Sequence, residues 1–244
     1  MGSIWGAFRD FLALILTNLT VWTGSLGIAI ILFTILVRLV ILPLTIKQLK
    51  SSRKMQELQP MIADLRRKYG KDQQRFAEEM TKLYREYKVN PAGGCLPLLI
   101  QLPIFIGVYQ AVYQLVLDDT LPLATKNFLG INLALSAFQG QNPDLAASIP
   151  GFTTGFQGPE YLVLPILSVV FQLLVSLMAM PKIMDPQQKM MMQMMLFLPI
   201  VFGYIGFTFN QGAVLYWVAS AAFSMIQQYF ISGFGSLTNY LPFL

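Results

Sequence analysis

The sequence predicts an all-α membrane protein with five transmembrane helices, a cytoplasmic helical hairpin and an N-terminal interfacial helix. Apolar residues make up 55% of the chain and charged residues 12%, whereas soluble proteins carry roughly 25% charged residues. Several apolar stretches approach the ~20 residues that cross a bilayer as a helix. Of the 17 Lys and Arg residues, 12 fall within residues 47–88, which marks this segment as a polar insertion between spans.

Five apolar runs have the length of a transmembrane helix. They cover residues 26–46, 95–116, 161–180, 189–208 and 213–232. Turn-forming residues stand at their ends: the second run follows Asn90-Pro91-Ala92-Gly93-Gly94, the fourth follows Asp185-Pro186, and the fifth follows Asn210-Gln211-Gly212. The remaining connections are a long segment at 117–160, a short linker at 181–188 and a tail at 233–244.

The N-terminal segment, residues 1–25, predicts a short helix that lies on the membrane surface. Trp5, Phe8, Leu12 and Ile15 recur at helical spacing, and the charged pair Arg9-Asp10 interrupts the apolar run. An amphipathic helix of this kind buries one face in the interface between headgroups and acyl chains. The alternative is a frayed first span.

Residues 47–94 predict a helical hairpin outside the lipid. Two apolar stripes repeat every three or four residues: Met55, Leu58, Ile62, Leu65 and Tyr69, then Phe76, Met80, Leu83 and Tyr87. Pro60 suits the first turn of a helix, Gly70 ends it, and Asp72 can cap the next one. The basic residues expected to make the contacts of the hairpin are Arg66, Arg67, Lys68, Lys71 and Arg75. We expect them to face water or lipid headgroups rather than to read nucleic acid.

The charge distribution predicts one orientation. Cytoplasmic loops are enriched in Lys and Arg, and residues 47–88 carry 12 of them against six acidic residues. Residues 117–160 carry only Lys126 against four acidic residues. The N-terminus is therefore expected outside and the C-terminus inside, which requires an odd number of spans. The tail at 233–244 has no Lys or Arg.

The residue inventory argues against an enzyme. The chain has no His and a single Cys, Cys95, so an intrachain disulfide and the usual zinc sites are excluded. The five predicted spans contain no Asp or Glu, on which proton relays and ion-coupled transporters usually depend. No Walker loop or Gly-rich dinucleotide motif occurs. We expect no catalytic residue, cofactor or metal.

Arg38 is the residue most indicative of function. It lies within the first predicted span, nine residues before Lys47, or roughly 13 Å along a helix with a rise of 1.5 Å per residue. An Arg at the centre of a span costs roughly 2.5–3.5 kcal/mol on insertion scales. Its guanidinium does not lose its charge in proteins. The sequence therefore predicts a polar cavity within the membrane around Arg38.

Other polar residues form stripes on the predicted spans. Thr34 shares a face with Arg38, and Gln110 shares a face with Gln114, while Gln101 lies nearer the inside. The remaining stripes are Ser168, Gln172 and Ser176, then Trp217, Ser220, Ser224 and Gln228. Hydrogen bonding between helices is the ordinary role of such Ser residues, and we favour it for Ser168, Ser176 and Ser220. Trp217 is equally suited to the aromatic belt at the membrane surface. The Met cluster at 190–195 suits varied apolar partners or simple gap filling.

Several short motifs, in order along the chain, resemble those of the YidC-type membrane protein insertases, the family that includes the mitochondrial Oxa and chloroplast Albino proteins. They are Leu36-Val37-Arg38-Leu39, Leu42-Pro43-Leu44-Thr45, Lys82-Leu83-Tyr84, Asn90-Pro91-Ala92-Gly93-Gly94-Cys95-Leu96-Pro97, Gly212-Ala213-Val214-Leu215-Tyr216-Trp217 and Gln227-Gln228. The similarity extends over nearly the whole chain, which makes it more specific than any one motif.

The resemblance implies five helices around a hydrophilic groove that is open to the cytoplasm and to lipid and closed outside. Arg38 matches the groove arginine of the family; Thr34, Gln172 and Trp217 resemble groove-lining positions, to which Gln101, Ser224 and Gln228 are added. The implied partners are nascent membrane proteins and the lipid bilayer, with the ribosome, the signal recognition pathway and the Sec translocon as further candidates. The implied location is the bacterial inner membrane. The alternative is a small-solute channel or transporter with an anion site at Arg38.

Overall fold

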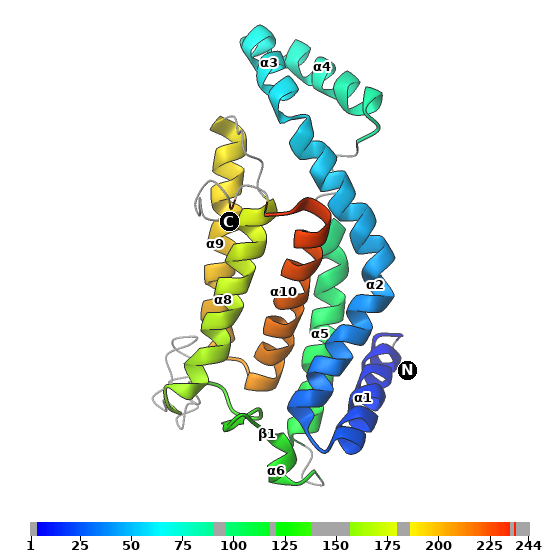
Figure 1. The fold of residues 1–244 in the computed structure, drawn as a ribbon, viewed down its shortest axis with the longest axis vertical. Helices are drawn as coiled ribbons and strands as arrows, with labels where there is room; N and C mark the ends of the chain where they lie inside the picture. Colours follow the sequence, from blue (N-terminus) through cyan, green and yellow to red (C-terminus); the bar gives the residue numbers. More distant parts are fainter. Residues whose placement is uncertain are drawn as a thin grey trace.

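The computed structural model describes residues 4–89, 96–117, 121–137, 157–179, 186–234 and 237. The chain folds into long helices that run side by side, with a helical hairpin projecting from one end (Figure 1). The elements are α1 Ile4–Thr23, α2 Leu26–Glu57, α3 Gln59–Tyr69, α4 Gln73–Glu86, α5 Leu96–Leu117, α6 Leu123–Lys126, β1 Asn127–Phe128, β2 Ile131–Asn132, α8 Glu160–Ala179, α9 Pro186–Gly206 and α10 Gln211–Ser232. We call the two ends of the bundle the hairpin end and the loop end, which carries α6, β1 and β2.

Helix α10 lies at the centre of the bundle. It packs against α8 on one side and against α2 and α5 on the other, and α9 packs on α8. The core is mainly aliphatic and aromatic, with Ile30, Phe33, Val112 and Val214 no more than 1% exposed, and it also contains buried Ser, Thr and Gln side chains. Apart from the two-residue strands β1 and β2, the described elements are helices, so the predicted all-α class is confirmed.

Four helices in the described part of the chain are long and apolar enough to cross a membrane: Ile4–Thr23, Leu26–Glu57, Glu160–Ala179 and Gln211–Ile231. The last three coincide with expected spans. Helices α5 and α9 cover the second and fourth expected spans, although the side chains at the start of each lie outside the described residues. The first helix, α1, was expected to lie on the membrane surface.

Helix α1 packs along α2 and α5, and in Figure 1 it lies beside the half of α2 nearest the loop end. Its first turn is held by Trp5, whose Nε1 donates to Oε1 of Gln110 over 3.0 Å. Gly107 allows the close approach, because a Cβ there would lie 2.8 Å from Phe8 and 2.9 Å from Leu12. The predicted face of Trp5, Phe8 and Leu12 therefore packs on protein.

Helix α2 is longer than predicted. We expected a span ending at residue 46, but the helix begins at Leu26, capped by Ser25, and continues through Pro43 to Glu57. The change from apolar to basic residues after 46 marks the expected edge of the lipid, not the end of the helix. Residues 47–57 are mostly Lys, Gln, Arg, Met and Glu, which are good helix formers, so the helix extends beyond the bundle.

The hairpin of α3 and α4 matches its predicted features. Pro60 lies in the first turn of α3, Gly70 ends it, and the Asp72 carboxylate accepts from the Arg75 backbone N–H at the start of α4. Leu58, Ile62 and Val89 form a small core of their own. The hairpin therefore has an apolar centre separate from that of the bundle.

Residues 121–137 lie at the loop end of the bundle and bond to α5 and α10. The first two backbone N–H groups of α10, those of Gln211 and Gly212, donate to the carbonyl oxygens of Leu135 and Leu133 over 2.8 and 3.0 Å. The buried Lys126 donates from Nζ to the Val116 carbonyl near the end of α5, over 2.8 Å. These bonds satisfy helix-end groups that would otherwise lack partners and fix the loop across α5 and α10.

Candidate functional site

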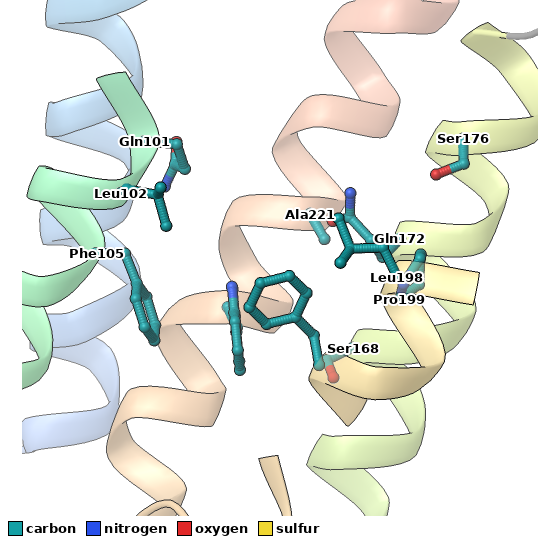
Figure 2. Close-up of a pocket in the computed structure, with 11 residues that line it drawn as sticks. Gln101, Leu102, Phe105, Ser168, Gln172, Ser176, Leu198, Pro199 and Ala221 are labelled. Atoms are coloured by element: carbon teal, nitrogen blue, oxygen red, sulfur yellow. The ribbon is translucent and has the colours of Figure 1, made fainter. Parts of the chain in front are cut away.

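A cavity of about 180 Å³ opens between α5, α8, α9 and α10 (Figure 2). Polar and aromatic side chains line it together. The lining residues are Gln101, Leu102, Phe105, Ser168, Gln172, Ser176, Leu198, Pro199, Phe202, Trp217 and Ala221. Such a mixture can accept an apolar segment while offering hydrogen bonds to polar groups.

The polar side chains come from opposite walls of the cavity. Gln101 projects from α5, and Gln172 and Ser176 project from successive turns of α8 on the other side (Figure 2). Gln172 is exposed, so its amide is free to meet water or a ligand. Ser168 is buried and donates to the Pro165 carbonyl of its own helix over 2.7 Å.

Aromatic rings form the part of the cavity nearer the loop end. The rings of Phe105 on α5 and Trp217 on α10 stack with their centroids 4.6 Å apart, and Phe202 on α9 meets Trp217 edge-on at 5.2 Å. Tyr109 and Phe209 continue the cluster with centroids 4.8 Å apart. The cavity is therefore polar toward the hairpin end and apolar toward the loop end.

Arg38 lies on α2, half-buried against α10, and is not among the residues that line the cavity. Its Nε and Nη2 both donate to Ser220 Oγ, over 3.2 and 2.5 Å. Among the described residues, no carboxylate forms a salt bridge with Arg38. The charge of Arg38 is therefore not neutralised by a carboxylate of the described chain and can attract an anionic ligand.

A short path of polar side chains connects Arg38 to the cavity wall. Ser220, its partner, lies one turn from Tyr216 on α10. Gln101, which lines the cavity, donates from Nε2 to the Tyr216 hydroxyl over 3.2 Å. These hydroxyl and amide groups thus connect the positive charge with the cavity wall.

The predicted groove residues divide into two groups. Gln101, Gln172 and Trp217 do line the cavity. Thr34 does not: its side chain is 1% exposed, and its hydroxyl donates to the Ile30 carbonyl. The remaining two, Ser224 and Gln228, also lie outside the lining.

Ser224 donates to the Ser220 carbonyl of its own helix, and Gln228 is 2% exposed. The polar stripe on α10 is therefore partly directed into the packed interior. The bond from Arg38 on α2 confirms the expected hydrogen bonding of Ser220 between helices, but Arg38 as its partner is not predicted from the sequence. One feature of the sequence could have indicated this partner. The predicted spans contain no acidic residue, so a guanidinium within them can pair only with hydroxyl and amide groups.

The predicted contact residues of the hairpin are mostly exposed, but several have partners within it. Arg67 lies 3.4 Å from Asp64, Arg75 lies 3.9 Å from Asp72, and Arg66 lies over the Phe76 ring. Lys68 and Lys71 are exposed. The exposed Lys82 on α4 donates a hydrogen bond to Glu79 Oε1, and this bond raises the pKa of Lys82. The face remains basic, since Lys and Arg outnumber the acidic residues there and surface ion pairs hold their partners only weakly.

The side chains of the Met cluster and Cys95 lie outside the described residues.

Comparison with known proteins assigns the family. The profile of the family described as 60Kd inner membrane protein matches residues 18–236. A membrane protein insertase YidC of Fusobacterium nucleatum is 34% identical over 232 residues, which cover 95% of this chain and 98% of that protein. The chain belongs to the YidC family. Proteins of this family are multi-pass inner membrane proteins, in agreement with the helices described above.

Other relatives are longer. The YidC insertase of Geobacter sulfurreducens is 38% identical over 212 residues, covering 86% of this chain and 34% of that protein. That of Haemophilus influenzae is 37% identical over 205 residues, covering 84% and 33%. This chain thus spans about a third of the length of these relatives. A crystal structure described as an active YidC insertase with its first transmembrane domain resolved matches with a TM-score of 0.64 and 28% identity, covering 93% of this chain and 47% of that one.

Proposed function

We propose that this protein is a membrane protein insertase that accepts short-tailed transmembrane segments and releases them sideways into lipid. The observation that carries the proposal is Arg38, a half-buried guanidinium without a carboxylate partner in the described chain, placed beside a cavity with polar walls. Membership in a family whose relatives are named insertases supports the same conclusion. No covalent step or nucleotide hydrolysis is needed.

The proposed orientation places the hairpin in the cytoplasm and the loop end outside, with the N-terminus out and the C-terminus in. The basic residues at 47–88 support it. So does α1: its Trp5 is bonded to Gln110, which lies seven residues, or roughly 10 Å, from the loop end of α5. The other end of α1 adjoins the start of α2 at the same end. A helix whose two ends both lie nearer the loop end suits the outer leaflet, leaving α2, α5, α8, α9 and α10 as the five spans.

The mechanism uses a groove that shortens the dry distance across the bilayer. Water entering from the cytoplasm would reach the polar half of the cavity, where Gln101, Gln172 and Ser176 lie. An acidic outer tail of a substrate then meets the charge of Arg38. With a negative interior, moving one acidic charge outward gains about 2.3 kcal/mol per 100 mV. The apolar segment leaves along α8 and α10, driven by its transfer into lipid.

Closure of the loop end supports an insertase over a small-solute channel. A channel needs a path that reaches both sides. In this protein, Leu133 and Leu135 accept hydrogen bonds from the first turn of α10, and the rings of Phe105, Phe209 and Trp217 stack at the loop-end side of the cavity. We further propose that the exposed basic face of the hairpin contacts the ribosome, a targeting factor or the Sec translocon.

Substitution of Arg38 tests the proposal. In reconstituted vesicles, Arg38→Ala should lower insertion of a single-span substrate with an acidic outer tail by roughly tenfold, the loss of one charged contact. Arg38→Lys should retain much of the activity because it keeps the charge. A substrate whose tail carries Asn in place of Asp is the control and should be affected little. Equal insertion of the acidic substrate by the wild-type protein and Arg38→Ala would reject the charge role.

A further inference from the structure

The contact between Arg38 and Ser220 determines which part of the guanidinium is available to a ligand. A guanidinium has five N–H donors in a plane, and a carboxylate can bind two of them side by side. Two edges suit this arrangement: the side formed by Nε and one Nη, and the end formed by both Nη atoms. In this protein the side edge is occupied, because Nε and Nη2 both donate to Ser220 Oγ.

The end edge remains available. In the part of the chain that the structure describes, Ser220 is the one hydrogen-bond partner of Arg38, and Nη1 has none. Ser220 itself is 2% exposed, so it is fixed in the interface between α2 and α10. A buried hydroxyl that binds two donors of one arginine restricts the rotation of that side chain about its long axis.

We propose that Ser220 is a positioning residue that directs the Nη1–Nη2 edge of Arg38 toward the substrate, so that Arg38 binds one carboxylate of an acidic tail end-on. The inference rests on the proposed function and adds to it the substrate group and the geometry of its recognition. Without Ser220 the charge would remain, but the guanidinium would sample several orientations. It would then bind a carboxylate less tightly, because binding would have to offset the entropy lost when the side chain is ordered.

The test compares two substrates that differ only in Asp or Asn in the outer tail, in vesicles without a membrane potential. The measured quantity is the ratio of Asp-tail to Asn-tail insertion. Both substrates are measured with the same vesicle preparation, so the ratio does not depend on how much of the protein is active. Ser220→Ala should lower this ratio by roughly three- to tenfold. Ser220→Thr keeps the hydroxyl and should retain the ratio. Ser220→Asp should abolish the preference, because its own carboxylate would occupy Arg38.

Ser224→Ala is the matched control, since the Ser224 hydroxyl bonds to its own helix one turn away and should leave the ratio unchanged. Equal losses for both substrates in Ser220→Ala would show a merely structural role and overturn the inference, as would an unchanged preference in Ser220→Asp. Arg38→Ala is measured in parallel. If it leaves the ratio unchanged, the proposed charge role fails; if it lowers the ratio while Ser220→Ala does not, only the positioning role fails.

Discussion

Glycine residues set the closest contacts between elements of this protein. At Gly27, near the start of α2, the space that a Cβ would occupy is filled by the ring of Phe128 from β1. At Gly212, near the start of α10, a Cβ would lie 2.7 Å from a methyl group of Val112 on α5. Both contacts lie at the loop end, so the closure of this end depends on residues without side chains.

We therefore expect Gly27→Ala to destabilise the protein by about 1–3 kcal/mol, the usual cost of overpacking. The added methyl group would displace Phe128 and with it the β1–β2 turn. Thermal unfolding in detergent would measure the loss.

Combining Gly27→Ala with Phe128→Ala should recover part of the stability, because the two residues contact each other and their effects are coupled. Gly206→Ala is the control, since a Cβ there would lie 3.8 Å from Pro165, an ordinary contact. An unchanged unfolding temperature in Gly27→Ala would contradict the close packing of Phe128 on α2.

At the level of elements, α2 joins two parts that are otherwise separate. Its extension beyond the bundle is held by Gln56, which donates to the Ala179 carbonyl at the end of α8, and by Arg53, which donates to the Ile231 carbonyl of α10. Beyond Glu57 the hairpin depends on its own core of Leu58, Ile62 and Val89. A small core of this kind unfolds locally more easily than the bundle.

Ile62→Ala should loosen the hairpin and leave the bundle intact. Ile62 is 1% exposed, and removing such a side chain from a core costs about 2–5 kcal/mol. Hydrogen exchange should become faster in α3 and α4 but not in α10. Met61→Ala is the matched control, because Met61 is the next residue along the chain and its side chain is 41% exposed. Faster exchange throughout α10 would show that the hairpin and the bundle form one cooperative unit.

At the scale of the whole molecule, polarity differs between the two ends. The hairpin end carries most of the cationic side chains and the polar half of the cavity, and the loop end carries the aromatic cluster and the closing loop. This asymmetry is what a groove open on one side of a membrane requires.

Cysteine labelling should report that orientation. In a Cys95→Ser background, which removes the single native cysteine, an impermeant maleimide added to intact cells should label Leu129→Cys, because this turn residue is 86% exposed at the loop end. Met61→Cys in the hairpin should be labelled only after permeabilisation. The opposite pattern, or labelling of both from outside, would contradict the proposed topology.

Much of this protein was predictable from its sequence. Apolar runs, Pro60, Gly70 and Asp72 predict the helices and the hairpin because these are local properties of the chain. The start of α2 and the end of its apolar part follow in the same way. The length of α2 does not, since the sequence shows where lipid should end but the helix continues in water.

The sequence by itself determined that Arg38 is a charge within an apolar helix that needs a polar environment. Only the tertiary structure decided what provides it, because Ser220 lies 182 positions away and several Ser and Gln stripes have the same spacing. It also decided that Gln101, Gln172 and Trp217 share a cavity while Thr34 does not. Helical periodicity tells which residues share a face, but the rotation of each helix against its neighbours depends on packing across the whole bundle.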